Sequence, residues 1–188
     1  ALPPKQLLRI LPKELQSHPT FAPLHEYQFS PIVSIYLWFD VAWCDIDFAA
    51  MLDTTIQWIF NRRKLAPHEN SSVEKYPGHI SLTISAGNEL ADTRPEEVVL
   101  LCMEELKQAF PKAAGAKLLS WKVIKEKSAT FLATPAMEAR RLPGKTSIKN
   151  LILAGDWTAT GLPATLEGAA QSGKEAARHA LTLLGKEN

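Results

Sequence analysis

The chain has 188 residues, of which 46% are hydrophobic and 22% charged, and its formal net charge is +1 at pH 7. These values are typical of a soluble globular domain, and so small a charge gives no reason to expect a nucleic-acid partner. No apolar run reaches the roughly 18 residues of a membrane-spanning helix, and no signal peptide is visible.

The cysteines and histidines show no spacing typical of a redox or metal site. Cys44 and Cys102 are far apart in the sequence, a usage that fits a reducing cytoplasm. Cys102 falls on the apolar side of a predicted helix, so we expect it in the core. No two histidines are four residues apart, and we therefore expect no metal site; the five are His18, His25, His68, His79 and His179.

The first part of the chain predicts helices and strands in a simple order. Residues 4–11 predict a short helix, which Pro12 ends. A β-rich block follows, in which β-branched and aromatic residues gather or alternate with polar ones; its predicted strands are residues 31–39, 54–60 and 80–85.

A long helix is predicted over residues 93–110. Thr93 and Glu96 can form a capping box at its start, and Pro95 suits its first turn. Pro111 ends it, and residues 118–125 predict another strand. Strands, then a helix, then a strand indicate an α+β fold, with a mostly antiparallel sheet and helices on one of its faces.

The pattern changes near the end of the chain. Residues 135–149 read as a connector, and residues 151–154 (LILA) are the continuous apolar run typical of a strand buried on both faces in a parallel sheet. A helix rich in small residues is predicted from about Ala164 to Leu184.

The stretch NLILAGDWTATGLPATLEGAAQSG, residues 150–173, carries the strongest functional signal. A strand, a glycine-containing loop and a helix start form the geometry that binds phosphate-bearing cofactors. Asp156 at the strand tip can accept a hydrogen bond from a sugar or ribityl hydroxyl. Gly168 and Gly173 inside the helix each cost about 1 kcal/mol, which indicates close approach of another backbone or a cofactor. A tightly packed strand–helix unit with a capping loop explains the bare pattern equally well.

The motif GDWTATGLPATLEGAAQSG closely resembles the last FAD-contacting motif of the flavin amine oxidase and phytoene desaturase superfamily. Its WTATGLPATxEGA form resembles the squalene-associated subgroup, the hydroxysqualene dehydroxylases. Residues 30–39 (SPIVSIYLWF) and 129–135 (ATFLATP) resemble the same subgroup, and residues 1–4 (ALPP) resemble the segment that follows a strand of the FAD domain.

The resemblance implies a division of the chain and a set of cofactor contacts. Residues 1–145 would be a substrate-binding-type domain, and residues 146–188 the strand, loop and helix that complete a Rossmann-like FAD-binding domain. The GxGxxG fingerprint of that domain's amino-terminal half is absent from this sequence. The expected FAD contacts are Gly155, Asp156, Trp157, Gly161, Leu162, Pro163, Ala164, Thr165, Glu167, Gly168 and Ala169.

The resemblance also implies a reaction on a long isoprenoid. Reduced FAD would supply the hydride that replaces the hydroxyl of hydroxysqualene, to give squalene. Alternatives are a carotenoid (phytoene-type) desaturase, an amine oxidase, or a non-catalytic fragment that oligomerises through the surface normally covered by an FAD-binding half. Alone, the chain is expected to be inactive.

The expected substrate and localisation follow from the same resemblance. The substrate-lining candidates, each of which also fits a plain core position, are Tyr36, Trp38, Trp58, Phe60 and Phe131. Asp53, Glu138 and Glu167 could protonate a leaving hydroxyl, and no spacing singles one out, so the catalytic residue stays unassigned. We expect a cytoplasmic protein whose water-insoluble substrate brings it to the inner face of the membrane.

Overall fold

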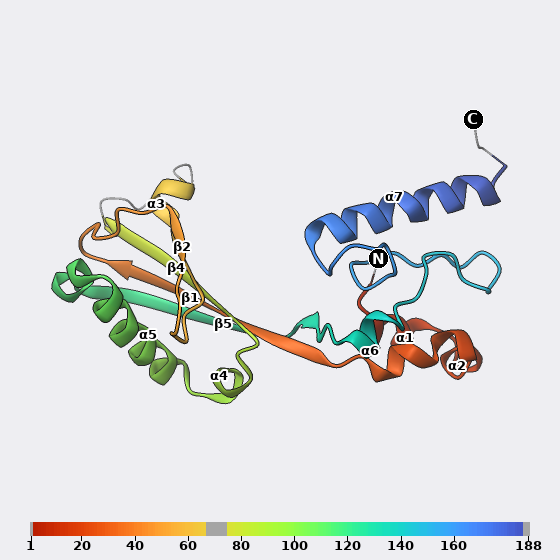
Figure 1. Ribbon diagram of the computed structural model, residues 1–188, viewed down its shortest axis with the longest axis horizontal. Helices are drawn as coiled ribbons and strands as arrows, with labels where there is room; N and C mark the ends of the chain where they lie inside the picture. Colours follow the sequence, from red (N-terminus) through yellow and green to blue (C-terminus); the bar gives the residue numbers. More distant parts are fainter. Residues whose placement is uncertain (1, 67–74, 186–188) are drawn as a thin grey trace. The chain divides into compact units, whose positions relative to one another are not determined.

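A computed structural model describes residues 2–66 and 75–185 of the chain (Figure 1). The chain forms two compact units, which we describe separately. One comprises residues 1–29 and 130–188, and the other residues 30–129. This division lies elsewhere than the boundary expected at residue 145, and the assignment of substrate-binding and FAD-binding parts stays a prediction.

The unit of residues 30–129 is built on a five-stranded sheet with the order β2-β3-β4-β1-β5. Strand β1 pairs antiparallel with β4, and β3 pairs antiparallel with both β2 and β4. The expected antiparallel sheet is therefore confirmed. The strands are β1 (Phe29–Phe39), β2 (Phe48–Ala50), β3 (Trp58–Asn61), β4 (Gly78–Ser85) and β5 (Leu118–Phe131).

One face of this sheet is covered by helix α5 (Pro95–Ala109) (Figure 1). Alternation along β1 places Val33, Ile35, Leu37 and Phe39 on that face, where all four are completely buried. Cys102 of α5 is also completely buried in the same core, as expected. The remaining helices of the unit are short: α3 (Arg62–Leu65), α4 (Asn88–Asp92) and the 3-10 helix η3 (Pro111–Gly115).

Two local expectations for this unit are wrong. No capping box forms at α5, because the Thr93 hydroxyl donates to the carbonyl of Glu89 and ends α4 instead. Residues 54–57 are not part of a strand, since the backbone N–H groups of Thr55 and Ile56 donate to the carboxylate of Glu105 at 2.8 and 2.9 Å. Both differences arise from contacts with side chains that local pattern does not reveal.

The other unit packs short helices around an apolar cluster and also contains the long helix α7. That cluster joins residues from both ends of the chain: Leu7, Leu11, Phe21, Leu24, Tyr27, Phe131, Met137, Leu142, Leu153 and Trp157. Its helices are α1 (Pro4–Ile10), α2 (Lys13–Gln16), the 3-10 helix η1 (Pro19–Glu26), α6 (Pro135–Glu138) and α7 (Leu166–Leu183). The predicted helices at residues 4–11 and 164–184 are confirmed, with ends shifted by one or two residues.

The strand expected at residues 151–154 is wrong. In the part of the chain that the structure describes, the run forms one isolated antiparallel bridge, between Lys145 and Ile152, and Leu153 alone of the run is buried. A strand buried on both faces needs hydrogen-bonded strands along its edges. Within residues 2–66 and 75–185, the segment finds only the short return at residues 144–145, where Leu153 N–H donates to Gly144 at 2.7 Å.

Candidate functional site

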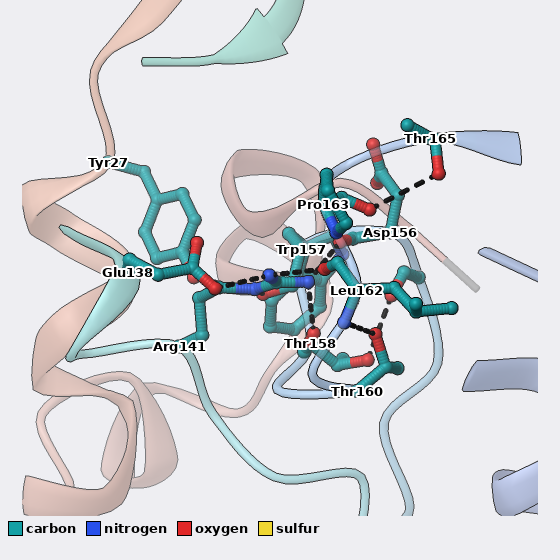
Figure 2. A network of polar contacts seen from close by, with 11 residues as sticks. Tyr27, Glu138, Arg141, Asp156, Trp157, Thr158, Thr160, Leu162, Pro163 and Thr165 are labelled. Atoms are coloured by element: carbon teal, nitrogen blue, oxygen red, sulfur yellow. Dashed lines mark hydrogen bonds and ion pairs between the residues drawn. The ribbon is translucent and has the colours of Figure 1, made fainter. Parts of the chain in front are cut away.

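The motif of residues 155–169 forms an irregular loop that leads into α7 (Figure 2). Thr165 caps the helix, because its hydroxyl oxygen accepts the N–H of Gly168 at 3.2 Å. Glu167 lies in the first turn, where a carboxylate is favourable beside the positive end of the helix dipole. The predicted helix start next to a glycine-containing loop is thus present.

The glycines in the motif differ in whether a Cβ atom would fit at their position. At Gly155, where φ is 154°, a Cβ would lie 2.4 Å from Nε1 of Trp157, and at Gly168 a Cβ would lie 2.5 Å from the carbonyl oxygen of Pro163. Both positions therefore require glycine for internal packing. Gly161 instead has a φ of 77° and open space where a Cβ would be, and Gly173 also faces open space in the described part of the chain. Close packing is confirmed at Gly168 and not observed at Gly173.

The inner side of the loop is anchored to the core. The Trp157 indole is 3% exposed, and its N–H donates to the carbonyl of Leu2 at 2.7 Å. The Thr158 hydroxyl donates to the carbonyl of Gly155 and lies 2.8 Å from the hydroxyl of Ser172 on α7. Ser172 also accepts the N–H of Gly155 at 2.8 Å. Loop and helix are therefore joined through buried hydroxyl groups.

Arg141 holds the loop from the side and was not among the expected site residues. Its side chain is 1% exposed and donates to the loop carbonyls of residues 156, 157, 158 and 162 and to the carboxylate of Glu138 (Figure 2). Its sequence neighbour Arg140 is half-exposed and pairs with Glu26. Two adjacent arginines in a connector carry no periodicity, so no sequence signal separates the buried one from the exposed one.

Tyr27 adds a second donor to the same loop. Its hydroxyl donates to the carbonyl of Trp157 at 3.1 Å, and its ring packs edge-on against Trp157 and Phe131. Burial raises the pKa of Tyr27 to about 12. The positive charge of Arg141 lowers this pKa, and the negative charges of Glu138 and Asp156 raise it slightly. The phenol therefore stays a neutral donor at ordinary pH.

Several backbone donors of the loop make no hydrogen bond in the described part of the chain. Among the residues that the structure describes, the backbone N–H groups of Asp156, Trp157 and Gly161 have no acceptor. Leu166, the first residue of α7, is 92% exposed. The loop thus combines an inner side held by hydrogen bonds with N–H donors that lack acceptors in the described chain, the partly buried residue Asp156 and the exposed apolar side chain of Leu166.

The three candidate proton donors are divided between the two units. Asp53 belongs to the sheet-containing unit, where it has a φ of 58°. Glu138 accepts from Arg141 at 2.7 Å, and Glu167 is exposed on α7. The geometry singles out none of them. Within residues 2–66 and 75–185, His, Cys, Asp and Glu form no cluster of three suited to a metal ion, and His68 lies outside those residues.

Four of the five candidate substrate-lining aromatics share one sheet face. Trp58 and Phe60 stack on β3 with ring centroids 6.1 Å apart, and Tyr36 and Trp38 stack on β1 at 6.3 Å. This aromatic face is opposite the face that α5 covers, because these residues alternate with the buried positions of their strands. A shallow apolar hollow on it is lined by Phe48, Trp58, Phe60, Leu65 and Thr83.

Phe131 belongs to the other unit. It is 4% exposed and packs in the core of the other unit, where the Arg141 guanidinium lies 5.7 Å from its ring centroid. The structure thus places Phe131 among the residues that support the motif loop.

In the described part of the chain, no helix is long and apolar enough to span a bilayer.

Comparison with known proteins gives relatives along nearly the whole chain. A hydroxysqualene dehydroxylase of Sinorhizobium fredii is 35% identical over 97% of this chain and 38% of its own length. Another, of Rhodopseudomonas palustris, is 45% identical over 54% of this chain and 24% of its own length. A 15-cis-phytoene desaturase of Synechococcus elongatus is 26% identical over 93% of this chain and 37% of its own length. The chain therefore spans less than two fifths of the length of these relatives.

Solved structures share the fold at low sequence identity. A reduced UDP-galactopyranose mutase matches 97% of this chain and 40% of its own, with a TM-score of 0.62 and 15% sequence identity. An oxidoreductase from Methanosarcina mazei matches 90% of this chain and 39% of its own, with a TM-score of 0.57 and 17% identity. The family model described as flavin containing amine oxidoreductase matches residues 1–181, and the chain belongs to that family, as its final motif led us to expect.

Proposed function

We propose that this chain works as the carboxy-terminal portion of a longer FAD-dependent oxidoreductase, and that residues 155–169 contact the FAD. Family membership implies a flavin. The observation that carries the proposal is the two-sided loop: its inner side is fixed by buried hydrogen bonds, while the N–H groups of Asp156, Trp157 and Gly161 find no acceptor in the described chain. Such donors suit the oxygen atoms of a flavin nucleotide.

The residues of the loop would divide the cofactor contacts among them. The Asp156 carboxylate would accept a hydrogen bond from the ribityl chain or lie near the pyrophosphate. Residues 161–165 would run along the flavin, where Gly161 leaves room for close approach. Residues 167–169 open α7 and would bring the positive end of its dipole to the cofactor. Bound FAD would supply the hydride-transfer chemistry itself.

We further propose reductive dehydroxylation of hydroxysqualene to squalene as the reaction. In this reaction a C–OH bond would be replaced by a C–H bond: the reduced flavin FADH2 would supply one hydride to carbon and one proton to the hydroxyl, which would leave as water, and oxidised FAD would remain. Hydroxysqualene dehydroxylases among the relatives support this assignment. Phytoene desaturases among the same relatives make desaturation, with hydride transfer from substrate to flavin, the second candidate.

A long isoprenoid substrate needs an apolar wall, and the aromatic face of the sheet offers one. Trp58 is 41% exposed and Phe48 57% exposed, although both are large apolar side chains. We propose that this face, with Tyr36, Trp38 and Phe60, lines the substrate path. Contact with the inner face of the membrane would deliver so water-insoluble a substrate to a cytoplasmic enzyme.

A non-catalytic fragment that self-associates is the alternative of a different class. Exposed apolar side chains on α7, such as Leu181 and Leu183, would favour association of the 188-residue chain. Gel filtration and FAD titration of that chain separate the two proposals. A flavin-free oligomer would support the fragment alternative, whereas a monomer that binds FAD would contradict it.

The reaction is tested on the full-length protein. It is incubated with hydroxysqualene, FAD and a reductant, and squalene is followed by mass-resolved chromatography. Squalene should form only with reduced flavin, and Asp156→Asn should raise the FAD dissociation constant about tenfold, as the loss of one charge-assisted hydrogen bond does. Asp47→Asn, at an exposed position of the other unit, is the matched control and should change neither. Desaturation of phytoene with oxidised FAD, without squalene formation, would move the assignment to the desaturases.

A further inference from the structure

Arg141 uses every donor of its guanidinium, four on the motif loop and one on Glu138. The group has five N–H bonds, and the five hydrogen bonds observed match that number. Nε donates to Trp157 at 3.3 Å, and Nη1 to Leu162 and Glu138 at 2.7 Å each. Nη2 donates to the carbonyls of Asp156, at 2.7 Å, and Thr158. Four of the five acceptors are backbone carbonyls of the motif loop.

Such a cluster of carbonyls dictates the path of the loop. In extended chain, successive carbonyls point to opposite sides, so three consecutive carbonyls that meet one cation require the backbone to curl around it. Each peptide unit is planar and trans, and its N–H points away from its C=O. The guanidinium that gathers the carbonyls of residues 156–158 therefore also directs the N–H groups of residues 157–159. Of these, the Trp157 N–H lacks an acceptor in the described chain.

Burial of a guanidinium costs free energy unless its hydrogen bonds are all made, and the carboxylate that pairs with Arg141 in the described chain, that of Glu138, is half-exposed. Neutral apolar packing would stabilise this core without that cost. The arginine instead fixes the geometry of the loop, since its planar guanidinium can donate to these acceptors in one arrangement only. Tyr27 supports the same arrangement with its hydrogen bond to Trp157.

We propose that Arg141 is a positioning residue for the flavin: by holding the carbonyl groups of residues 156, 157, 158 and 162, it fixes the conformation in which the motif loop binds FAD. The inference rests on the proposed function of the loop. Arg141 itself is buried and acts through the backbone that it holds.

The test compares two variants of the full-length protein that lose stability for different reasons. Arg141→Lys keeps the charge, but an ammonium has only three donors and lacks the planar fork. Leu24→Ala removes a side chain of the same core, 3% exposed, that makes no hydrogen bond to the loop. FAD affinity, the flavin absorption bands and the reduction potential are measured for both, together with thermal unfolding.

Arg141→Lys should raise the FAD dissociation constant about 10- to 100-fold, which corresponds to the loss of one or two charge-assisted hydrogen bonds. It should also shift the absorption bands and the reduction potential of the flavin. Leu24→Ala should leave the affinity of the folded protein within about threefold of the wild type and its bands unchanged, because Leu24 belongs to the same core but makes no hydrogen bond to the loop. Should Arg141→Lys fail to fold, the FAD affinity of Tyr27→Phe tests the inference in its place. It removes one donor to Trp157 and should weaken FAD binding about threefold to tenfold.

Wild-type affinity and bands in Arg141→Lys would overturn the inference. Equal loss of affinity in Arg141→Lys and Leu24→Ala, in proportion to their lost stability, would overturn it too, because Arg141 would then have a structural role alone. Both outcomes leave the proposed function intact. A wild-type protein that bound no flavin would instead overturn the proposed function together with the inference.

Discussion

The hydroxyl oxygens of Thr158 and Ser172 lie 2.8 Å apart, and both residues are almost completely buried. This contact joins the motif loop to the second turn of α7, and Ser172 also accepts the N–H of Gly155. Two buried hydroxyl groups and one backbone N–H thus satisfy one another where a cofactor-binding loop meets its helix.

Ser172→Ala should therefore destabilise the protein. The substitution leaves the N–H of Gly155 buried without an acceptor, which costs about 1–3 kcal/mol of unfolding free energy. Urea unfolding measures the change. Lys174→Ala, at an exposed position of the same helix, is the control and should stay within about 0.5 kcal/mol of the wild type. Equal stability of Ser172→Ala and the wild type would contradict the hydrogen-bonded junction.

Gly168 and Gly173 should respond in opposite directions to substitution by alanine. At Gly168 the new Cβ would meet the Pro163 carbonyl at 2.5 Å, so the loop must shift, and we expect a loss of about 1–3 kcal/mol. At Gly173 the structure leaves the space open, and alanine should stabilise the helix by up to about 1 kcal/mol. Thermal unfolding of the 188-residue chain compares the two variants. Destabilisation by Gly173→Ala in that chain would show a contact that the structure lacks.

The stability of the protein should fall in alkaline solution because of Tyr27. Its pKa is raised from the ordinary 10.0 of a tyrosine to about 12 in the folded protein, so the folded state holds the phenol proton more tightly. This contribution is present in full below pH 10 and is lost as pH rises through about 12, by roughly 1–3 kcal/mol.

Tyr27→Phe is the matched variant for that measurement. At neutral pH it should be less stable than the wild type by about 1 kcal/mol, because it lacks the hydrogen bond to Trp157. Between pH 10 and 12 the difference should shrink, since the variant has no phenol to ionise. A difference that stayed constant over this interval would show that Tyr27 does not titrate as its burial requires.

Glu105 should stabilise the sheet-containing unit through the loop that precedes β3. Its carboxylate accepts the N–H groups of Thr55 and Ile56, and Ile56 is completely buried. Glu105→Ala should cost about 2 kcal/mol, because both backbone donors lose their partner. Glu104→Ala, one residue earlier and exposed on α5, should be nearly neutral. Similar unfolding midpoints for the two variants would contradict the role of Glu105.

The sheet, α5 and α7 could be predicted because their signals are local. Alternation along residues 80–85 and the recurrence of apolar residues between Val98 and Leu106 survive in the structure as a buried strand face and a buried helix face. The motif at residues 155–169 was identified by resemblance, since its glycines alone did not separate a cofactor loop from a packed turn.

The rest depends on contacts between distant parts of the chain. Arg141 meets the motif 15 or more residues later in the sequence, and Trp157 donates to Leu2 across 155 residues. The apolar run at residues 151–154 has the composition of a buried strand, but strand formation is decided by neighbours that composition does not report. Tertiary hydrogen bonds of this kind leave no periodic signal in the sequence.

The most direct test of the central claim is amide hydrogen exchange of the full-length protein with and without FAD. We predict that FAD slows exchange in peptides that cover residues 155–169, where the N–H groups of Asp156, Trp157 and Gly161 lack acceptors in the described chain, while peptides from α5 stay unchanged. Bound FAD that left exchange at residues 155–169 unaltered would contradict the claim that this loop holds the cofactor.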